Sequence, residues 1–128
     1  MQALALLAFL LVAANLAVAQ QLSPAEREIL MLQDQRSLGD GKLVSHLSNA
    51  DPRLRSRAAM ALANLQDTST VQAVLPLLKD PEAIVRESAA FALGQIGSNA
   101  AQDSLLTQLK IETNPDVLVR ILEALGKV

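Results

Sequence analysis

The fold is decided by a stretch of eight residues that occurs twice. RSRAAMAL at residues 55–62 is followed, 31 residues later, by RESAAFAL at residues 86–93. A further 32 residues carry Ala92-Leu93-Gly94 onto Ala124-Leu125-Gly126. Self-similarity at a fixed period is the signature of a repeat architecture, in which each unit buries its apolar face against the next. The sequence therefore predicts three stacked units.

Each unit is predicted to be a pair of helices. Apolar residues recur every three or four positions from Val85 to Ile96, which is the spacing of one helix face. A shorter run with the same spacing, from Val71 to Leu78, predicts the first helix of that unit. A capping side chain precedes a first-turn proline in each second helix, namely at Asp51-Pro52, Asp80-Pro81 and Asn114-Pro115. From these caps, we expect the second helix of the middle unit to begin two residues early.

The N-terminal stretch is uncharged and apolar. No charged side chain occurs before residue 26, and Ala3 to Ala19 is broken only by Asn15. The stretch ends in Ala17-Val18-Ala19, the small-x-small pattern that signal peptidase accepts. We therefore expect a secretory signal peptide that is cleaved after Ala19, and an exported protein that is periplasmic or extracellular, without a membrane span after cleavage.

An uncleaved membrane anchor is the alternative. No Lys or Arg precedes the apolar run, although signal peptides usually begin with positive charge. The run also reaches the short end of the roughly 17–25 residues that span a bilayer.

Ahead of the first unit, one further helix is predicted to cover the end of the stack. Ser23 and Glu26 form a capping box around Pro24 at the first helical position. The helix is expected over residues 24–38, ended by Gly39-Asp40-Gly41. The predicted fold class is all-α, an α-solenoid of about three helix pairs, seven helices in all with the N-terminal capping helix. Its predicted divisions are a signal peptide (1–19), the capping helix and turn (20–41) and the repeats 42–68, 69–98 and 99–128.

Residues 80–97, DPEAIVRESAAFALGQIG, resemble a HEAT repeat of the short bacterial type that is also found in phycobilisome lyases. The resemblance covers about residues 42–128 and implies the same all-α solenoid. It also implies a ladder in which an Asp and an Arg six residues apart tie neighbouring units.

The ladder that this resemblance implies is incomplete. The middle unit carries the full pair, Asp80 with Arg86, whereas the first unit has Arg55 but Asn49 at the Asp position. The third unit has Leu118 where Arg would stand, so the ladder is expected to lapse there. In the first unit, Asp51 with Arg57 is an alternative pair. We expect a structural role for these residues, because a buried guanidinium needs its carboxylate.

The composition excludes several classes of function. The chain has no Cys, Trp or Tyr and a net charge of -2, so neither a basic stripe nor an aromatic platform is available for nucleic acid. HEAT-type deoxyhypusine hydroxylases bind iron through several His-Glu pairs, whereas this chain has only His46 and no His-Glu dipeptide. We therefore expect no catalytic constellation, no metal or other cofactor, and no small-molecule substrate.

A protein partner is expected on the face of the second helices that the core does not use. Ser88, Phe91 and Gln95 share a helix face, and the repeat offsets carry them to equivalent positions in the other units. The three predicted rows are Arg57, Ser88, Arg120; Met60, Phe91, Glu123; and Asn64, Gln95, Lys127. We expect this concave face, centred on Phe91 and Met60, to bind the partner.

The predicted function is a non-enzymatic exported scaffold that mediates protein–protein interaction. The alternative is the N-terminal repeat portion of a larger exported enzyme, such as a cyclophilin-type prolyl isomerase, because residues 29–51 resemble the start of exported bacterial HEAT proteins that carry such a domain. Val128 aligns with Ile96, inside the last turn of a second helix and without the expected cap. We therefore expect an array that continues, or an open edge that a partner meets.

Overall fold

The computed structural model describes residues 2–128, apart from the side chains at positions 16, 18, 19 and 20. Within this range the chain forms α-helices and short 3-10 helices and no strand. The α-helices are α1 (Gln2–Gln21), α2 (Pro24–Asp34), α3 (Lys42–Ser45), α4 (Pro52–Leu65), α5 (Val71–Val74), α6 (Ala83–Ile96), α7 (Gln102–Leu109) and α8 (Pro115–Leu125). The 3-10 helices are His46–Ser48, Thr68–Thr70, Leu75–Lys79 and Asn99–Ala101.

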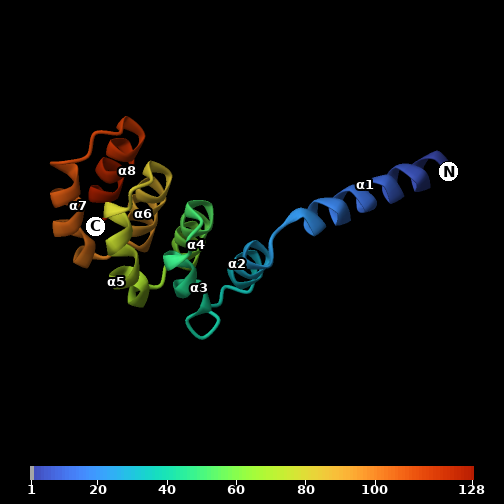
Figure 1. The fold of residues 1–128 in the computed structure, drawn as a ribbon, viewed down its shortest axis with the longest axis horizontal. Helices are drawn as coiled ribbons and strands as arrows, with labels where there is room; N and C mark the ends of the chain where they lie inside the picture. Colours follow the sequence, from blue (N-terminus) through green and yellow to red (C-terminus); the bar gives the residue numbers. More distant parts are fainter. Residues whose placement is uncertain (1) are drawn as a thin grey trace.

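The helices are arranged as a solenoid, as predicted. The four helices α2, α4, α6 and α8 lie side by side in chain order, and α3, α5 and α7 lie along one side of that row (Figure 1). The predicted capping helix α2 packs on α4. Each of the three units thus pairs a short first helix with a longer second helix.

The second helices begin in register with the repeat. They start at Pro52, Ala83 and Pro115, which are 31 and 32 residues apart. Asp51 and Asn114 cap α4 and α8 as predicted, with bonds of 2.9 Å from Arg53 N and 3.0 Å from Asp116 N.

Asp80 does not cap α6. Its Oδ1 accepts from Glu82 N at 2.9 Å, and α6 begins only after Glu82, which makes no side-chain cap bond. The predicted early start of the second helix in the middle unit is therefore wrong, because Asp80 faces the preceding unit instead.

Two other helix ends differ from the predictions. The capping box at Ser23 is present, because Glu26 N donates to Ser23 Oγ at 3.2 Å and Ser23 N donates to Glu26 Oε2 at 2.8 Å. The helix α2 nevertheless ends at Asp34 rather than at residue 38. Arg36, with φ of 50°, turns the chain out of the helix. At the other end, α8 stops at Leu125 and Gly126 is its C-cap, so a helix running uncapped to Val128 is not observed.

The second helices approach one another closely because the residues between them are small. Ala59 and Ala90 are fully buried, and so is Gly94 in α6. A Cβ added to Gly94 would lie 2.9 Å from the Cα of Ala124 in α8, which is closer than real side chains come. The spacing of α6 and α8 is therefore set by backbone contact.

One arginine ties each of the first two units to the unit that follows. Arg55 donates to both carboxylate oxygens of Asp80, at 2.8 and 2.9 Å, and Arg86 donates to those of Glu112, at 2.8 and 3.0 Å. Asp80 and Glu112 stand at equivalent positions, 32 residues apart, so the two pairs are successive rungs of one ladder. Bidentate pairs of this kind combine charge with fixed geometry.

Each ladder arginine also holds the loop of its own unit. Arg86 Nη1 donates to the carbonyl oxygens of Asp80 at 2.9 Å and Pro81 at 3.1 Å. Arg55 Nη1 does the same with Asn49 and Ala50, at 2.8 and 3.1 Å. The guanidinium thus closes the loop before its helix on one edge and binds the next unit on the other.

The predicted pairing within the ladder is wrong. Arg86 meets only the backbone of Asp80, and the Asp80 side chain takes Arg55 instead. The alternative pair of Asp51 with Arg57 is not formed either, because Asp51 binds Arg53 at 3.0 Å. The expected ladder thus ties neighbouring units, but its carboxylates come from the following unit, and Glu112 is its second acid.

The N-terminal helix α1 extends away from the stack (Figure 1), with exposed side chains such as Leu4 and Leu11. The predicted cleavage position is not described beyond the backbone, since the Ala19 side chain lies outside the described residues. In the part of the chain that the structure describes, no helix meets both the length and the apolarity that crossing a membrane requires.

The Glu112 carboxylate is the strongly perturbed acid of the ladder. The Arg86 guanidinium lowers the pKa of Glu112 from 4.5 to about 2, against the opposing effect of burial. Bonds from Gln108 Nε2 at 3.0 Å and Asn114 N at 3.1 Å add to the lowering.

Replacing this acid should therefore change how stability depends on pH. Glu112→Gln should lower the free energy of unfolding at pH 7 by on the order of 3 kcal/mol. Because the folded-state pKa is depressed, this stabilisation is fully present above pH 4.5 and is lost as the pH falls through about 2. Urea unfolding at a series of pH values should show the gap between wild type and variant closing between pH 5 and pH 2.

Glu82→Gln is the matched control, since Glu82 is exposed and its change should stay within about 0.5 kcal/mol. A gap for Glu112→Gln that stays constant across this pH range would contradict the role given to the ladder.

Candidate partner-binding face

The second-helix face is defined here as the outer side of α4, α6 and α8 around Met60, Ile84, Phe91 and Arg120. Met60 projects from α4 with 40% of its surface exposed, and Ile84 from the first turn of α6 with 52% exposed. Phe91 lies two turns further along α6 and is half-buried. Together they line a depression of about 300 Å³ between the three helices. Its full lining is Ser56, Met60, Ile84, Glu87, Ser88, Phe91 and Arg120.

Arg120 closes one side of this depression. Its guanidinium carbon lies 5.5 Å from the centre of the Phe91 ring, within the range of a cation–π contact. The same guanidinium donates to Glu123 at 3.0 Å and to Glu87 at 3.3 Å. These two carboxylates, Glu123 first, raise the pKa of Arg120. Arg120 is therefore held in place over Phe91 with its charge balanced.

Ser88 lines the depression but is almost fully buried beneath it. It is 7% exposed, and its Oγ lies 2.6 Å from the Oγ of Ser56 on the neighbouring helix. Ser88 is therefore less accessible than the prediction of a partner-facing residue requires. The two hydroxyls instead bond to one another in the interface between α4 and α6, as buried polar groups require.

The other predicted residues do not line the depression. Arg57 is exposed, with its Nε 3.8 Å from a carboxylate oxygen of Glu26 in α2. Asn64 borders a separate hollow beside α2. Gln95 is half-buried, and Glu123 and Lys127 are exposed. The structure thus brings together Met60, Phe91 and Arg120, one residue from each second helix.

Sequence reasoning missed Ile84, Glu87 and Ser56 as lining residues. Ile84 precedes Phe91 by seven residues, so helical spacing alone would have placed the two side chains on one face. Glu87 and Ser56 carry no comparable signal, because their roles depend on which residue of the next helix stands opposite.

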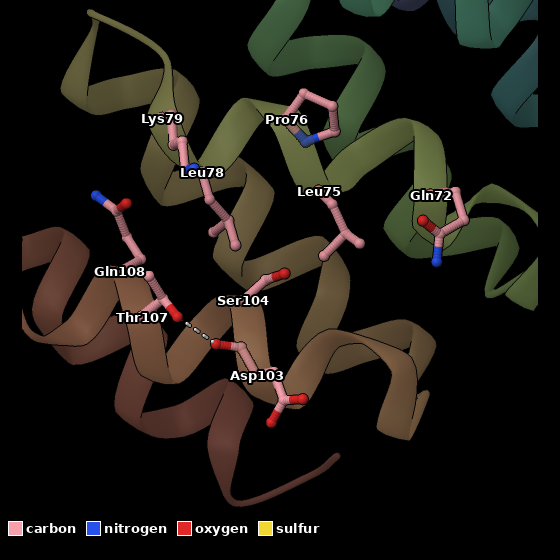
Figure 2. A pocket seen from close by; sticks show the side chains of 9 residues that line it. All are labelled: Gln72, Leu75, Pro76, Leu78, Lys79, Asp103, Ser104, Thr107 and Gln108. Carbon is pink, nitrogen blue, oxygen red and sulfur yellow. Dashed lines mark hydrogen bonds between the residues drawn. The ribbon is translucent and has the colours of Figure 1, made fainter.

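A second hollow lies on the side of the first helices. Figure 2 shows Leu75 and Pro76 of one unit across from Ser104 and Thr107 of the next, around a volume of about 560 Å³. The lining is completed by Gln72, Leu78, Lys79, Asp103 and Gln108.

Two polar side chains of this hollow, Thr107 and Gln108, take part in hydrogen bonds within the fold. Thr107 Oγ1 donates to the carbonyl oxygen of Asp103 at 2.8 Å, and Gln108 Nε2 donates to Glu112. The Gln108 Oε1 is buried without a hydrogen-bond partner among the described residues. No side chain here pairs a nucleophile with a base.

The single histidine is part of the packing between α2 and the first unit. His46 Nε2 lies 2.7 Å from Glu28 Oε2, and the His46 side chain is 11% exposed. Lys42 reaches the same carboxylate at 3.8 Å. No group of three or more His, Cys, Asp or Glu is placed to hold a metal ion within the part of the chain that the structure describes. His46, Glu28 and Lys42 do not fit an iron site built from several His-Glu pairs.

Comparison with known proteins gives two findings. A family model described as HEAT repeats matches residues 42–126. Deoxyhypusine hydroxylase-B of Oryza sativa subsp. japonica is 36% identical over 75 residues, which cover 58% of this chain and 25% of that protein. The chain thus spans about a quarter of the length of this relative.

The family match spans most of the chain and coincides with the three helix pairs from α3 to α8. The repeat offset, the paired helices and the arginine ladder agree with it. The chain therefore belongs to the family of HEAT-repeat proteins.

Proposed function

We propose that this chain is a non-enzymatic, exported HEAT-repeat scaffold that binds a protein partner on its second-helix face. The observation that carries the proposal is the depression between α4, α6 and α8, where exposed apolar side chains stand beside a fixed guanidinium. Repeat solenoids commonly use the surface of successive second helices for binding. Exposed Met and aromatic side chains are enriched where proteins bind one another.

The chemistry of the depression indicates the kind of partner side chain. Met60, Ile84 and Phe91 offer an apolar floor, and Met60 adapts its shape readily because it is unbranched. Glu87 and Arg120 lie at the rim and already neutralise one another. An apolar side chain flanked by polar backbone suits this surface better than a charged group does.

We propose no hydroxylase activity for this chain. The match covers a quarter of that protein, and the one histidine of this chain is bonded to Glu28. The pairing of this histidine with Glu28 supports a scaffold rather than an iron-dependent hydroxylase.

Charge placed on the second-helix face should abolish partner capture. A double variant, Met60→Asp with Ile84→Asp, should reduce the partner recovered in a pull-down from a cell-envelope extract at least about tenfold, because burying an unpaired carboxylate is costly. Both side chains are already exposed, so the helical circular dichroism and the unfolding transition should stay close to those of the wild type.

The matched control is Met31→Asp with Leu106→Asp, which charges two exposed apolar side chains away from this face. Equal partner recovery with both double variants would show that the second-helix face does not bind.

Export forms the second part of the proposal, and it rests on the apolar stretch that ends in Ala17-Val18-Ala19. Mass spectrometry of the protein purified from its native host should show a chain that begins at Gln20. An intact chain that still carries residues 1–19 and sediments with membranes would favour an uncleaved anchor instead.

A further inference from the structure

Two serine hydroxyls lie at the base of the depression on the second-helix face. Ser56 of α4 and Ser88 of α6 both line it, and with exposures of 8% and 7% each is more than nine-tenths buried. Their Oγ atoms lie 2.6 Å apart, so one hydroxyl donates its proton to the other. Each oxygen thus has a hydrogen-bond partner inside the protein.

One proton of this pair has no acceptor. Each serine carries one O–H donor, so the pair holds two donors, and the bond between them uses only one. Other hydroxyls on the helices of this chain donate to the backbone. Ser45 and Thr107 bond to carbonyl oxygens three and four residues earlier, at 2.6 and 2.8 Å. Neither Ser56 nor Ser88 makes such a bond within the described part of the chain, so a free O–H donor remains beneath the depression.

Arg120 adds a second free donor at the rim. Its Nε and Nη1 donate to Glu87 and Glu123, whereas its Nη2 makes no hydrogen bond with any residue that the structure describes. The two carboxylates share this one guanidinium, so one negative charge is left at the rim. That charge disfavours an anionic acceptor such as a carboxylate or a phosphate. The acceptor that suits these donors is therefore a neutral oxygen.

A backbone carbonyl beside an apolar side chain meets these requirements. Met60, Ile84 and Phe91 supply an apolar surface for the side chain, above the buried hydroxyls. A helical partner could not supply the acceptor, because the carbonyl groups of a helix interior are bonded within the helix. A segment in an extended conformation keeps its carbonyl groups free for a binding surface. The donors of the depression therefore favour an extended segment over a helix.

We propose that the second-helix face binds an extended peptide segment, whose apolar side chain enters the depression while an adjoining backbone carbonyl accepts the free proton of the Ser56–Ser88 pair. This inference rests on the proposed binding function of the face, and it adds the conformation of the partner and the group that the face recognises. The two serines then hold the acceptor in place as well as joining α4 to α6.

N-acetyl-leucine methylamide is the probe that tests this inference, because it carries a branched apolar side chain between two neutral peptide groups. Titrated into the full-length chain in a non-denaturing detergent, it should shift the NMR signals of residues around the depression with a Kd on the order of 1 mM, as expected for a ligand of its size. In Ser56→Ala with Ser88→Ala, the loss of one hydrogen bond should raise the Kd about fivefold. Urea unfolding of this variant should match that of the wild type, because both members of a buried polar pair are removed together.

Ser104→Ala is the matched control, since it removes a half-buried serine from the side of the first helices and should leave the Kd unchanged. Suppose that the probe binds the double serine variant as well as the wild type but does not bind Met60→Asp with Ile84→Asp. The recognition of a carbonyl by the serines would then be overturned, while the face would remain a binding surface.

Two other results would also overturn this inference. One is equal binding of the probe to the wild type and to both double variants, which would place the probe elsewhere. The other is a wild type without NMR shifts at about 50 mM probe, where a millimolar site is nearly filled. In both cases, recovery of the partner with Met60→Asp and Ile84→Asp decides independently whether the face binds a protein.

Discussion

The backbone contact between second helices is the constraint on which the rest of the structure depends. Gly94 faces Ala124 so closely that a Cβ could not be added without displacing α8. Helices at this distance leave room only for Ala, Gly and Ser between them, and this explains the alanine-rich octapeptide of the first two repeats. The larger polar groups are pushed to the edges of the interface, where Arg55 and Arg86 reach across to the carboxylates of the next unit.

Most of the fold could be predicted from the sequence because the repeat signals are local. Matched offsets gave the number of units, and the side chains at Ser23, Asp51 and Asn114 cap helices as their sequence context indicates. The cap at Asp80 failed because a second interaction competes for the same carboxylate. Arg55 of the preceding unit takes Asp80, and a sequence pattern within one unit cannot show such a contact.

The second-helix face was predicted less well than the fold, because it too depends on contacts between units that a pattern within one unit cannot show. The repeat offset aligns Ser88 with Arg57 and Arg120, both on the outer side, yet Ser88 is buried against Ser56. The side-chain hydrogen bonds between successive second helices join Ser56 to Ser88 and Glu87 to Arg120, each pair one position more than the repeat offset apart. Phe91 and Met60 could be predicted because they are apolar at positions that the core does not use. The contact of Arg120 with Phe91 could not, because it depends on how α8 packs against α6.

The measurement that tests the central claim most directly is the stability of Gly94→Ala by urea unfolding. In a helix interior, alanine is favoured over glycine by up to about 1 kcal/mol, so propensity alone predicts a stabilised protein. If backbone contact with Ala124 sets the spacing of the units, the added methyl group must displace α8, and the free energy of unfolding should fall by about 1–3 kcal/mol. A Gly94→Ala protein that is as stable as the wild type, or more stable, would contradict this account.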